Sequence, residues 1–150
     1  ARSHLSSARS QEVKVRIETD TWYHICGTYD GKELRIYLNG TFKDQFDLPF
    51  GEDDEFHSKG DFHIGGIPGK HAWEGYIDEV RVWSDIKSEA EVRAGMNKVC
   101  VGTTAGLLAQ WTFNEGSGEQ VIDTSGNKNN GAFERYAGGV ELRRVQSSRP

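Results

Sequence analysis

The sequence predicts an all-β protein, built from antiparallel strands with one short helix. Two observations carry this prediction: apolar residues alternate with polar ones in short runs, and clusters of Gly, Asn and Asp separate the runs. Gly is frequent at 18 residues, Pro is scarce at 3, and only 35% of the 150 residues are hydrophobic. A chain of this length and composition has room for one polar domain with one core.

The first half of the chain predicts a meander of three strands. Residues 13–17, VKVRI, alternate as a half-buried strand does, and WYHICGTY over 22–29 reads as the second strand. Leu34, Ile36 and Leu38 alternate in the third. The second and third strands end in dipeptides that tolerate the positive φ of a tight hairpin, Asp30-Gly31 and Asn39-Gly40.

The second turn is also a candidate modification site. Asn39-Gly40-Thr41 is an N-x-T sequon, so Asn39 is a possible acceptor for an N-linked glycan. An Asn-Gly dipeptide between alternating strands is equally what hairpin geometry selects without any sugar. The sequence leaves both readings open and favours the turn.

Asp78 interrupts the strand predicted over residues 75–83, GYIDEVRVW. Strict alternation would turn its carboxylate toward the core beside Val80 and Val82. Either a bulge resets the face, or Asp78 is buried and hydrogen-bonded. A contact with a cation or a ligand is the functional alternative, so Asp78 is a candidate metal ligand.

The second half predicts two further strands and the helix. DFHIGG, residues 61–66, reads as a short strand, and GLLAQWTF, residues 106–113, reads as a longer one. Between them, Ser88 and Glu91 form a capping box ahead of helix formers, with Val92 and Met96 four residues apart on one face.

Two loops carry enough oxygen ligands to suggest a hard cation. The acidic loop over residues 51–60, GEDDEFHSKG, is a solvated loop or a carboxylate cluster. In the second loop, side-chain oxygens recur at every second residue, a spacing that can converge on calcium: Asp123, Ser125, Asn127 and Asn129. Asx turns give the same composition without an ion, and the full EF-hand pattern fails because Lys128 occupies the position that needs Gly.

Charge and cysteine content narrow the class of protein. The formal net charge is -5 with both signs mixed, which argues against a nucleic-acid surface. No run of about 18 apolar residues exists to span a membrane. Cys26 and Cys100 lack metal-ligand spacing, and they either form a bridge or remain buried thiols.

Five segments, taken in order, resemble the laminin-G-like and pentraxin-like branch of the concanavalin-A-like jelly rolls. They are WYHICGTYDGKELRIYLNG, FHIGG, WEGYIDEVRVWSDIKSEAEV, LLAQWTFNEGSG and DTSGNKNNG, and they span Trp22 to Phe133. The resemblance implies a jelly-roll β-sandwich of two antiparallel sheets. We expect a loop over residues 1–12, the sandwich over 13–140 and a polar tail over 141–150.

The resemblance also implies that the early strands of the domain are missing. Residues 1–20 match none of them, so the chain resembles the C-terminal two-thirds of a domain, and other domains or chains are expected to complete the sandwich. In pentraxins, the thiol that corresponds to Cys26 pairs with a cysteine in that early half. The resemblance therefore implies that Cys26 is unpaired here.

Function in this family is recognition, often assisted by calcium at the rim of the sandwich. The resemblance implies a non-catalytic module that binds carbohydrate or a protein partner within a larger extracellular or cell-surface protein, with Trp73 and Tyr136 as candidate ligand contacts. After HIGG, pentraxins place a carboxylate cluster on calcium, whereas this chain has Ile67, Pro68 and Gly69. The alternative is a structural sandwich that docks onto neighbouring domains without a small ligand.

An enzyme is not expected, although glucanases share this fold. Glycosidases need two carboxylates facing one glycosidic bond. Asp78 and Glu79 point to opposite faces of a strand, and the loop over residues 52–55 has no aromatic sugar platform nearby. No Ser-His-Asp or Cys-His set is readable either.

Overall fold

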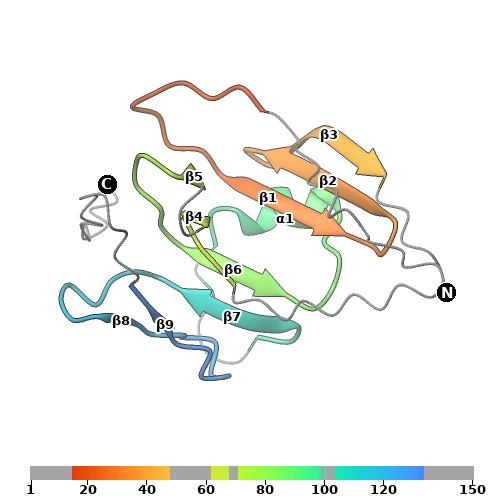
Figure 1. Ribbon diagram of the computed structural model, residues 1–150. Helices are drawn as coiled ribbons and strands as arrows, with labels where there is room; N and C mark the ends of the chain where they lie inside the picture. The colour runs from red at the N-terminus through yellow and green to blue at the C-terminus, as the bar shows by residue number, and fades with distance from the viewer. Residues whose placement is uncertain (1–14, 48–61, 68–70, 99, 101–103, 134–150) are drawn as a thin grey trace, which may run out of the picture. The chain divides into compact units, whose positions relative to one another are not determined.

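The computed structural model describes residues 15–47, 62–67, 71–98, 100 and 104–133 (Figure 1). These residues carry nine strands and one helix, as the all-β prediction requires. The chain divides into two units. Residues 1–54 and 86–98 belong to the first, and residues 55–85 and 99–150 belong to the second.

The first unit contains the predicted meander. Strands β1 (Ile25–Tyr29), β2 (Glu33–Leu38) and β3 (Thr41–Asp47) form an antiparallel sheet in the order β1-β2-β3. Leu38 pairs with Thr41 across a two-residue turn, in which Asn39 has φ 51° and Gly40 has φ 72°. Positive φ at both positions is the signature of a type I′ hairpin, so the Asn-Gly prediction is confirmed.

The turn between β1 and β2 is held by a side chain. Asp30 Oδ1 accepts hydrogen bonds from the N–H groups of Glu33 at 2.7 Å and Lys32 at 2.9 Å. These bonds stabilise the carboxylate and lower the pKa of Asp30. An Asx turn of this kind is the reason that Asp begins the loop, while Gly31 supplies the positive φ of 92°.

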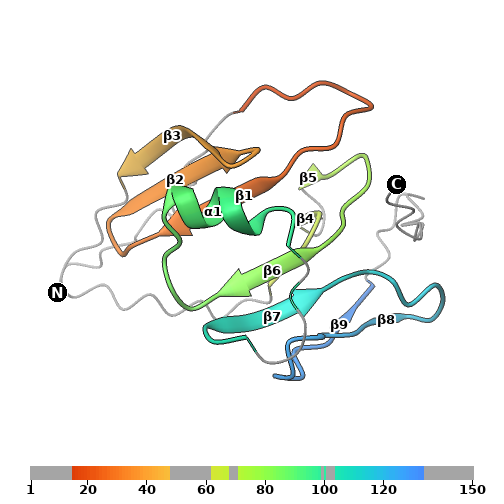
Figure 2. The same ribbon diagram turned by 180° about the vertical axis from the view of Figure 1, so that it is seen from behind.

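Helix α1 (Glu89–Gly95) packs across one face of this sheet (Figure 2). The predicted capping box is present: Ser88 Oγ accepts a hydrogen bond from Glu91 N at 3.4 Å, and Glu91 Oε2 accepts one from Ser88 N at 2.8 Å. Val92 is the buried residue of the helix. Among the described helices, none has the length and apolar content needed to cross a membrane.

Gly40 is required at the contact between hairpin and helix. A Cβ at this position would lie 2.9 Å from the Arg93 Cα, and the positive φ disfavours any other residue. We expect Gly40→Ala to lower the free energy of unfolding by about 2 kcal/mol, because a clash with helix backbone adds to the strain of the turn. Urea denaturation measures this loss, with Gly31→Ala as a control that has positive φ and open space around the Cβ. Equal losses in both variants would contradict the role of the helix contact.

The second unit consists of three two-stranded antiparallel ribbons. They are β4 (Gly66–Ile67) with β5 (His71–Ala72), β6 (Val80–Trp83) with β7 (Leu107–Trp111), and β8 (Gln120–Val121) with β9 (Gly131–Ala132). An isolated bridge between Trp111, the last residue of β7, and Asp123 joins β7 to the segment that follows β8.

The core of the second unit gathers on one face of β7. Ala109, Trp111 and Val121 are buried, and partly buried apolar residues pack against them: Ile64, Val80, Val82, Phe113 and Phe133. The alternation predicted for β7 is confirmed at Leu107, Ala109 and Trp111, since all three are buried while Leu108 is 45% exposed. Gln110 departs from it, because this polar residue is only 1% exposed.

Five predicted strands differ from the structure in their bounds. The strand expected over 22–29 is β1, Ile25–Tyr29, and the strand expected over 106–113 is β7, Leu107–Trp111. Residues 15–18 lie outside any strand, and residues 13 and 14 lie outside the described part of the chain. The strand expected over 61–66 begins only at Gly66, and the strand expected over 75–83 begins only at Val80. Glu79 has φ 54°, which breaks the extended backbone. Asp78 therefore precedes the strand, and the alternation of β6 does not determine the direction of its carboxylate.

Candidate functional site

The predicted ligand and metal residues with a described position lie in the second unit, whereas Asn39 lies in the first. Tyr136 lies outside the described residues. Asn39 is exposed, and its Oδ1 accepts a hydrogen bond from His24 N at 2.9 Å. The side chain therefore supports the turn, and its glycosylation stays a prediction.

Trp73 presents an indole that is held on the surface of the second unit. Its backbone N–H donates to the Gly65 carbonyl at 2.6 Å, which ties it to the residue that precedes β4. A Cβ built on Gly75 would lie 2.9 Å from the indole Nε1, so the ring rests directly against a backbone without a side chain. The side chain is still 41% exposed. Trp73 thus offers a supported aromatic ring to solvent.

Two more exposed aromatic residues occur in the segments that flank the β4–β5 ribbon. Phe62 is 67% exposed and Tyr76 is 64% exposed. The ring of Phe62 stacks on that of Trp111, with centroids 5.9 Å apart and planes inclined by 17°. We call Phe62, Trp73 and Tyr76 the exposed aromatic group. Exposed aromatic side chains of this kind are candidate contacts for a ligand.

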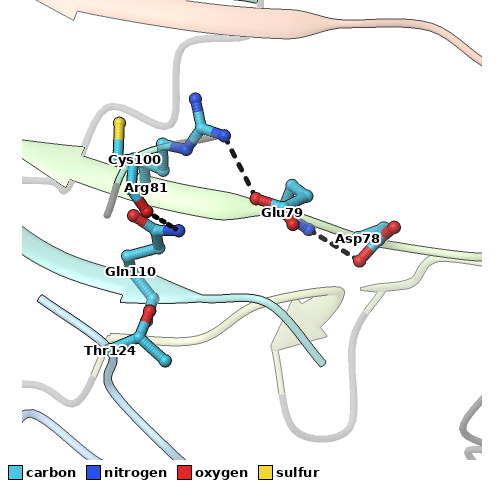
Figure 3. A network of polar contacts seen from close by, with 6 residues as sticks. All are labelled: Asp78, Glu79, Arg81, Cys100, Gln110 and Thr124. Atoms are coloured by element: carbon cyan, nitrogen blue, oxygen red, sulfur yellow. Dashed lines mark hydrogen bonds and ion pairs between the residues drawn. The ribbon is translucent and has the colours of Figure 1, made fainter. Parts of the chain in front are cut away.

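Acidic side chains follow Trp73 along the chain, and one of them is neutralised. Glu74 is exposed. Asp78 Oδ1 accepts a hydrogen bond from Glu79 N at 3.0 Å, and Glu79 Oε2 pairs with Arg81 Nη2 at 3.1 Å (Figure 3). The side chains of Glu79 and Arg81 are only 15% and 13% exposed. Glu79 therefore serves an internal ion pair with Arg81.

Gln110 is a buried polar residue that sequence reasoning placed on a strand face without a role. Its Nε2 donates to the Cys100 carbonyl at 3.3 Å, and its own backbone carbonyl accepts from Thr124 N at 2.8 Å (Figure 3). The side chain thereby joins the Cys100 backbone to β7. A Gln inside an otherwise apolar strand was the signal that could have revealed this.

The Asp123 loop, residues 123–129, uses its side chains to bind backbone. Asp123 Oδ1 accepts from Gln110 N at 3.0 Å and from Ser125 N at 2.8 Å, and Oδ2 accepts from Asn129 N at 2.9 Å. Asn127 Nδ2 and Asn129 Nδ2 both donate to the Leu108 carbonyl, at 3.0 Å and 2.9 Å. The loop is therefore fixed to β7 by its own polar groups, which accounts for its composition through Asx-type bonding.

These bonds determine the charge state of Asp123. Burial opposes ionisation, but the hydrogen bonds donated by Gln110, Ser125 and Asn129 outweigh it, so the pKa of Asp123 lies below its ordinary value. The carboxylate is ionised at neutral pH, and both of its oxygens accept hydrogen bonds from backbone N–H groups. Within the described residues, no three His, Cys, Asp or Glu side chains are grouped as metal ligands, and calcium at Asp78 or at this loop stays a prediction.

Both cysteines are free thiols, and they belong to different units. Cys26 is half-buried in β1, and burial raises the pKa of its thiol. The thiol form therefore predominates at neutral pH, which makes Cys26 a small apolar residue rather than a nucleophile.

Comparison with known proteins gives two matches. The model of a family described as the concanavalin A-like lectin/glucanases superfamily matches residues 3–93. The fold is also similar to a crystal structure of a proposed carbohydrate binding protein from Bacteroides ovatus ATCC 8483, with 28% sequence identity and a TM-score of 0.64. The match covers 79% of this chain and 36% of that one. No curated protein matches the chain.

Proposed function

Because this chain belongs to the concanavalin A-like lectin/glucanase superfamily, we propose that it is a non-catalytic module that binds carbohydrate through the exposed aromatic group. The observation that carries the proposal is the indole of Trp73, which is 41% exposed and rests against Gly75. The similarity to the Bacteroides ovatus protein supports a sugar as the ligand. We further propose that the module belongs to a larger protein at the cell surface or outside the cell, as the family resemblance implies.

An aromatic ring of this kind suits a pyranose. The face of an indole carries negative partial charge, and the C–H groups on one face of a sugar ring carry positive partial charge. Stacking the two removes apolar surface from water and leaves the hydroxyls at the edge free to form hydrogen bonds. A ring that its own backbone already supports loses little conformational freedom when the sugar binds, which favours affinity.

Hydrolysis is not part of the proposal. Glycosidases hold two carboxylates at the scissile bond, and one of them must be available to donate a proton. Among the described carboxylates near Trp73 in sequence, Glu79 is paired with Arg81 and Asp78 accepts a backbone hydrogen bond. Glu74 is exposed, but a glycosidase needs a second carboxylate beside it. Asp123 is committed to backbone N–H groups.

Replacement of Trp73 tests the proposal. We expect Trp73→Ala to weaken glycan binding by at least about tenfold, because aromatic anchors dominate such contacts. A glycan array identifies the ligand, and isothermal titration calorimetry with and without calcium measures its affinity. Trp22→Ala, which removes an indole that is 67% exposed in the first unit, is the matched control and should bind normally.

Two results would contradict the proposal. One is unchanged affinity in Trp73→Ala while its unfolding midpoint in urea is normal. The other is a wild-type protein that binds no glycan on the array, with or without calcium. The second result would favour a structural module that docks onto neighbouring domains.

One observation favours that structural alternative. Within the described residues, β1 is hydrogen-bonded to one strand, β2, and forms an edge of that sheet. Ile25 at the start of β1 is 51% exposed. An additional strand from a neighbouring domain would satisfy both features. Light scattering and crosslinking of the full-length parent protein would show whether this edge is occupied.

A further inference from the structure

We infer that strand β1 pairs with β1 of a second copy of this chain, in antiparallel orientation about a two-fold axis at Gly27. This interaction surface belongs to the first unit and does not depend on carbohydrate binding at Trp73. Four features of β1 point to it: the direction of its backbone groups, its exposure, its lack of edge protection and its self-complementary sequence.

The backbone groups that β1 directs outward belong to every second residue. Within the described residues, β1 forms one edge of its sheet, beside β2 (Figure 1). Just before β1, Asn39 N donates to the His24 carbonyl at 2.8 Å and His24 N donates to Asn39 Oδ1 at 2.9 Å, so the backbone of His24 faces β2. Since neighbouring residues of a strand direct their N–H and C=O groups to opposite sides, the residues that face the outer edge are Ile25, Gly27 and Tyr29.

The strand is accessible at its start and at its centre. Ile25 is 51% exposed. Gly27 is also exposed, and because it has no side chain, the exposed atoms are backbone. The nearest described atom to a Cβ built on Gly27 is the carbonyl oxygen of Arg35, at 4.0 Å, which belongs to β2. A second strand can therefore approach β1 at Gly27.

The two edges of the sheet differ in their protection. The β3 edge carries a bulge in its pairing with β2 and three charged residues, Lys43, Asp44 and Asp47. Charged side chains and bulges are the devices by which natural sheets prevent edge-to-edge pairing. Strand β1, ICGTY, contains no charged residue and no Pro, and its register with β2 is continuous along its whole length. The chain thus protects one edge of the sheet and leaves β1 suited to pairing.

The sequence around Gly27 is complementary to itself in the antiparallel direction. With the axis at Gly27, Ile25 lies opposite Tyr29 of the second copy, and His24 lies opposite Asp30 of the second copy. A β-branched residue opposite an aromatic one stabilises antiparallel strands, and so do opposite charges. Asp30 is ionised at neutral pH, and His24 is the residue type that most readily gains a positive charge beside a carboxylate.

Charge also selects this register over its two neighbours. An axis at Thr28 would place His24 opposite Lys32, and an axis at Cys26 would place Asp30 opposite Trp22. Of the three, the axis at Gly27 is the one that brings opposite charges together. The second copy is therefore a better match to this edge than an arbitrary strand.

Sedimentation equilibrium of the full chain tests for the dimer. We expect a reversible monomer–dimer equilibrium with a Kd on the order of 10 to 100 µM, because the paired segment is short. Gly27→Lys should weaken dimerisation at least about tenfold, since two ammonium groups would face each other at the axis. Gln45→Lys, which adds the same charge to an exposed position of β3, is the matched control and should dimerise normally. The urea midpoints of both variants verify that they fold.

Disulfide trapping tests the register. In the proposed dimer, Cys26 lies opposite Thr28 of the second copy in a non-hydrogen-bonded pair, with Cα atoms about 4.5 Å apart, a distance that a disulfide can span. In a Cys100→Ser background, Thr28→Cys should therefore give a reducible dimer on a non-reducing gel after mild oxidation. Two single-cysteine chains in the same background are the controls and should stay monomeric: one keeps Cys26 alone, and the other combines Thr28→Cys with Cys26→Ser. Their thiols would meet only with the axis at Cys26 or at Thr28.

Three results would overturn the inference. The first is a chain that remains monomeric at about 1 mM, which would leave the edge to a strand of a neighbouring domain. The second is a dimer that a folded Gly27→Lys variant does not weaken, because such a dimer forms through another surface. The third is efficient crosslinking of a single-cysteine chain without crosslinking of Thr28→Cys, which would exclude the axis at Gly27.

Discussion

Replacement of Asp123 by alanine should lower the free energy of unfolding by about 3 to 5 kcal/mol, because it orphans three backbone donors at once. The carboxylate is 6% exposed and accepts hydrogen bonds from the N–H groups of Gln110, Ser125 and Asn129. Two of these donors belong to the loop and one to β7, so the variant loses the connection between them. Urea denaturation followed by tryptophan fluorescence measures the loss.

The pH dependence of stability gives Asp123 a second signature. Its pKa is depressed in the folded state, so its contribution to stability is present above the unfolded pKa of about 4 and disappears as pH falls through the folded value. We expect Asp123→Asn to lose about half as much stability as alanine at pH 7, since one amide oxygen still accepts hydrogen bonds. Between pH 5 and pH 2, the free energy of unfolding of Asp123→Asn should also change less than that of the wild type. Urea denaturation at intervals of about one pH unit measures this difference. A wild-type acid transition retained in Asp123→Asn would show that another group is responsible.

Trp111→Ala should cost about 3 to 5 kcal/mol, because it empties the centre of the core in the second unit. The indole is 7% exposed, packs with Ala109 and Val121, and donates from Nε1 to the Asn129 carbonyl at 2.9 Å. The same ring stacks under Phe62, so the exposed aromatic group depends on it. Thermal and urea unfolding should both show the loss.

Trp111→Phe separates the two contributions of this side chain. Phenylalanine keeps an aromatic ring in the core but has no N–H to donate, so we expect a loss of about 1 to 2 kcal/mol. Trp83→Phe, in which a half-buried indole of β6 is replaced, is the matched control. A loss in Trp111→Ala no greater than that in Trp111→Phe would contradict the central position of Trp111 in the core.

The sequence predicted best those features that a few neighbouring residues determine. Asn39-Gly40 forms a type I′ turn because few other dipeptides accept two positive φ angles, and Ser88 with Glu91 caps α1 because both partners lie within one turn. The family resemblance and the concanavalin A-like fold class are confirmed by the match over residues 3–93. Local chemistry and the order of the motifs were sufficient for these predictions.

Strand bounds were predicted less well, because pairing depends on partners that alternation does not specify. Residues 15–18 alternate but lie outside any strand, and the Glu18 N–H donates instead to the Tyr23 hydroxyl at 3.2 Å. The positive φ of Glu79 could not be predicted from the sequence either, since a non-glycine residue seldom adopts this conformation. Its ion pair with Arg81 became visible only in the folded chain.

The structure shows that Trp73 is exposed, and its contact with a ligand stays a prediction. Trp73 was identified and is exposed, but the support from Gly75 and the exposure of Phe62 and Tyr76 emerged only from the structure. For the Asp123 loop, spacing alone could not distinguish oxygens that face an ion from oxygens that face backbone. In the structure, the carboxylate oxygens of Asp123 accept hydrogen bonds from backbone N–H groups.

The first unit is discontinuous in the chain, and this has a consequence for how it is made. Glu89 Oε1 accepts a hydrogen bond from Phe42 N, so the helix reaches a hairpin 47 positions earlier. Closing a segment of that length costs about 3 kcal/mol of chain entropy, which the contacts between helix and hairpin must offset. On the ribosome the hairpin therefore emerges well before helix α1, which packs on it. A nascent chain stalled ahead of residue 86 would leave the helix-facing side of the sheet exposed to chaperones or to aggregation.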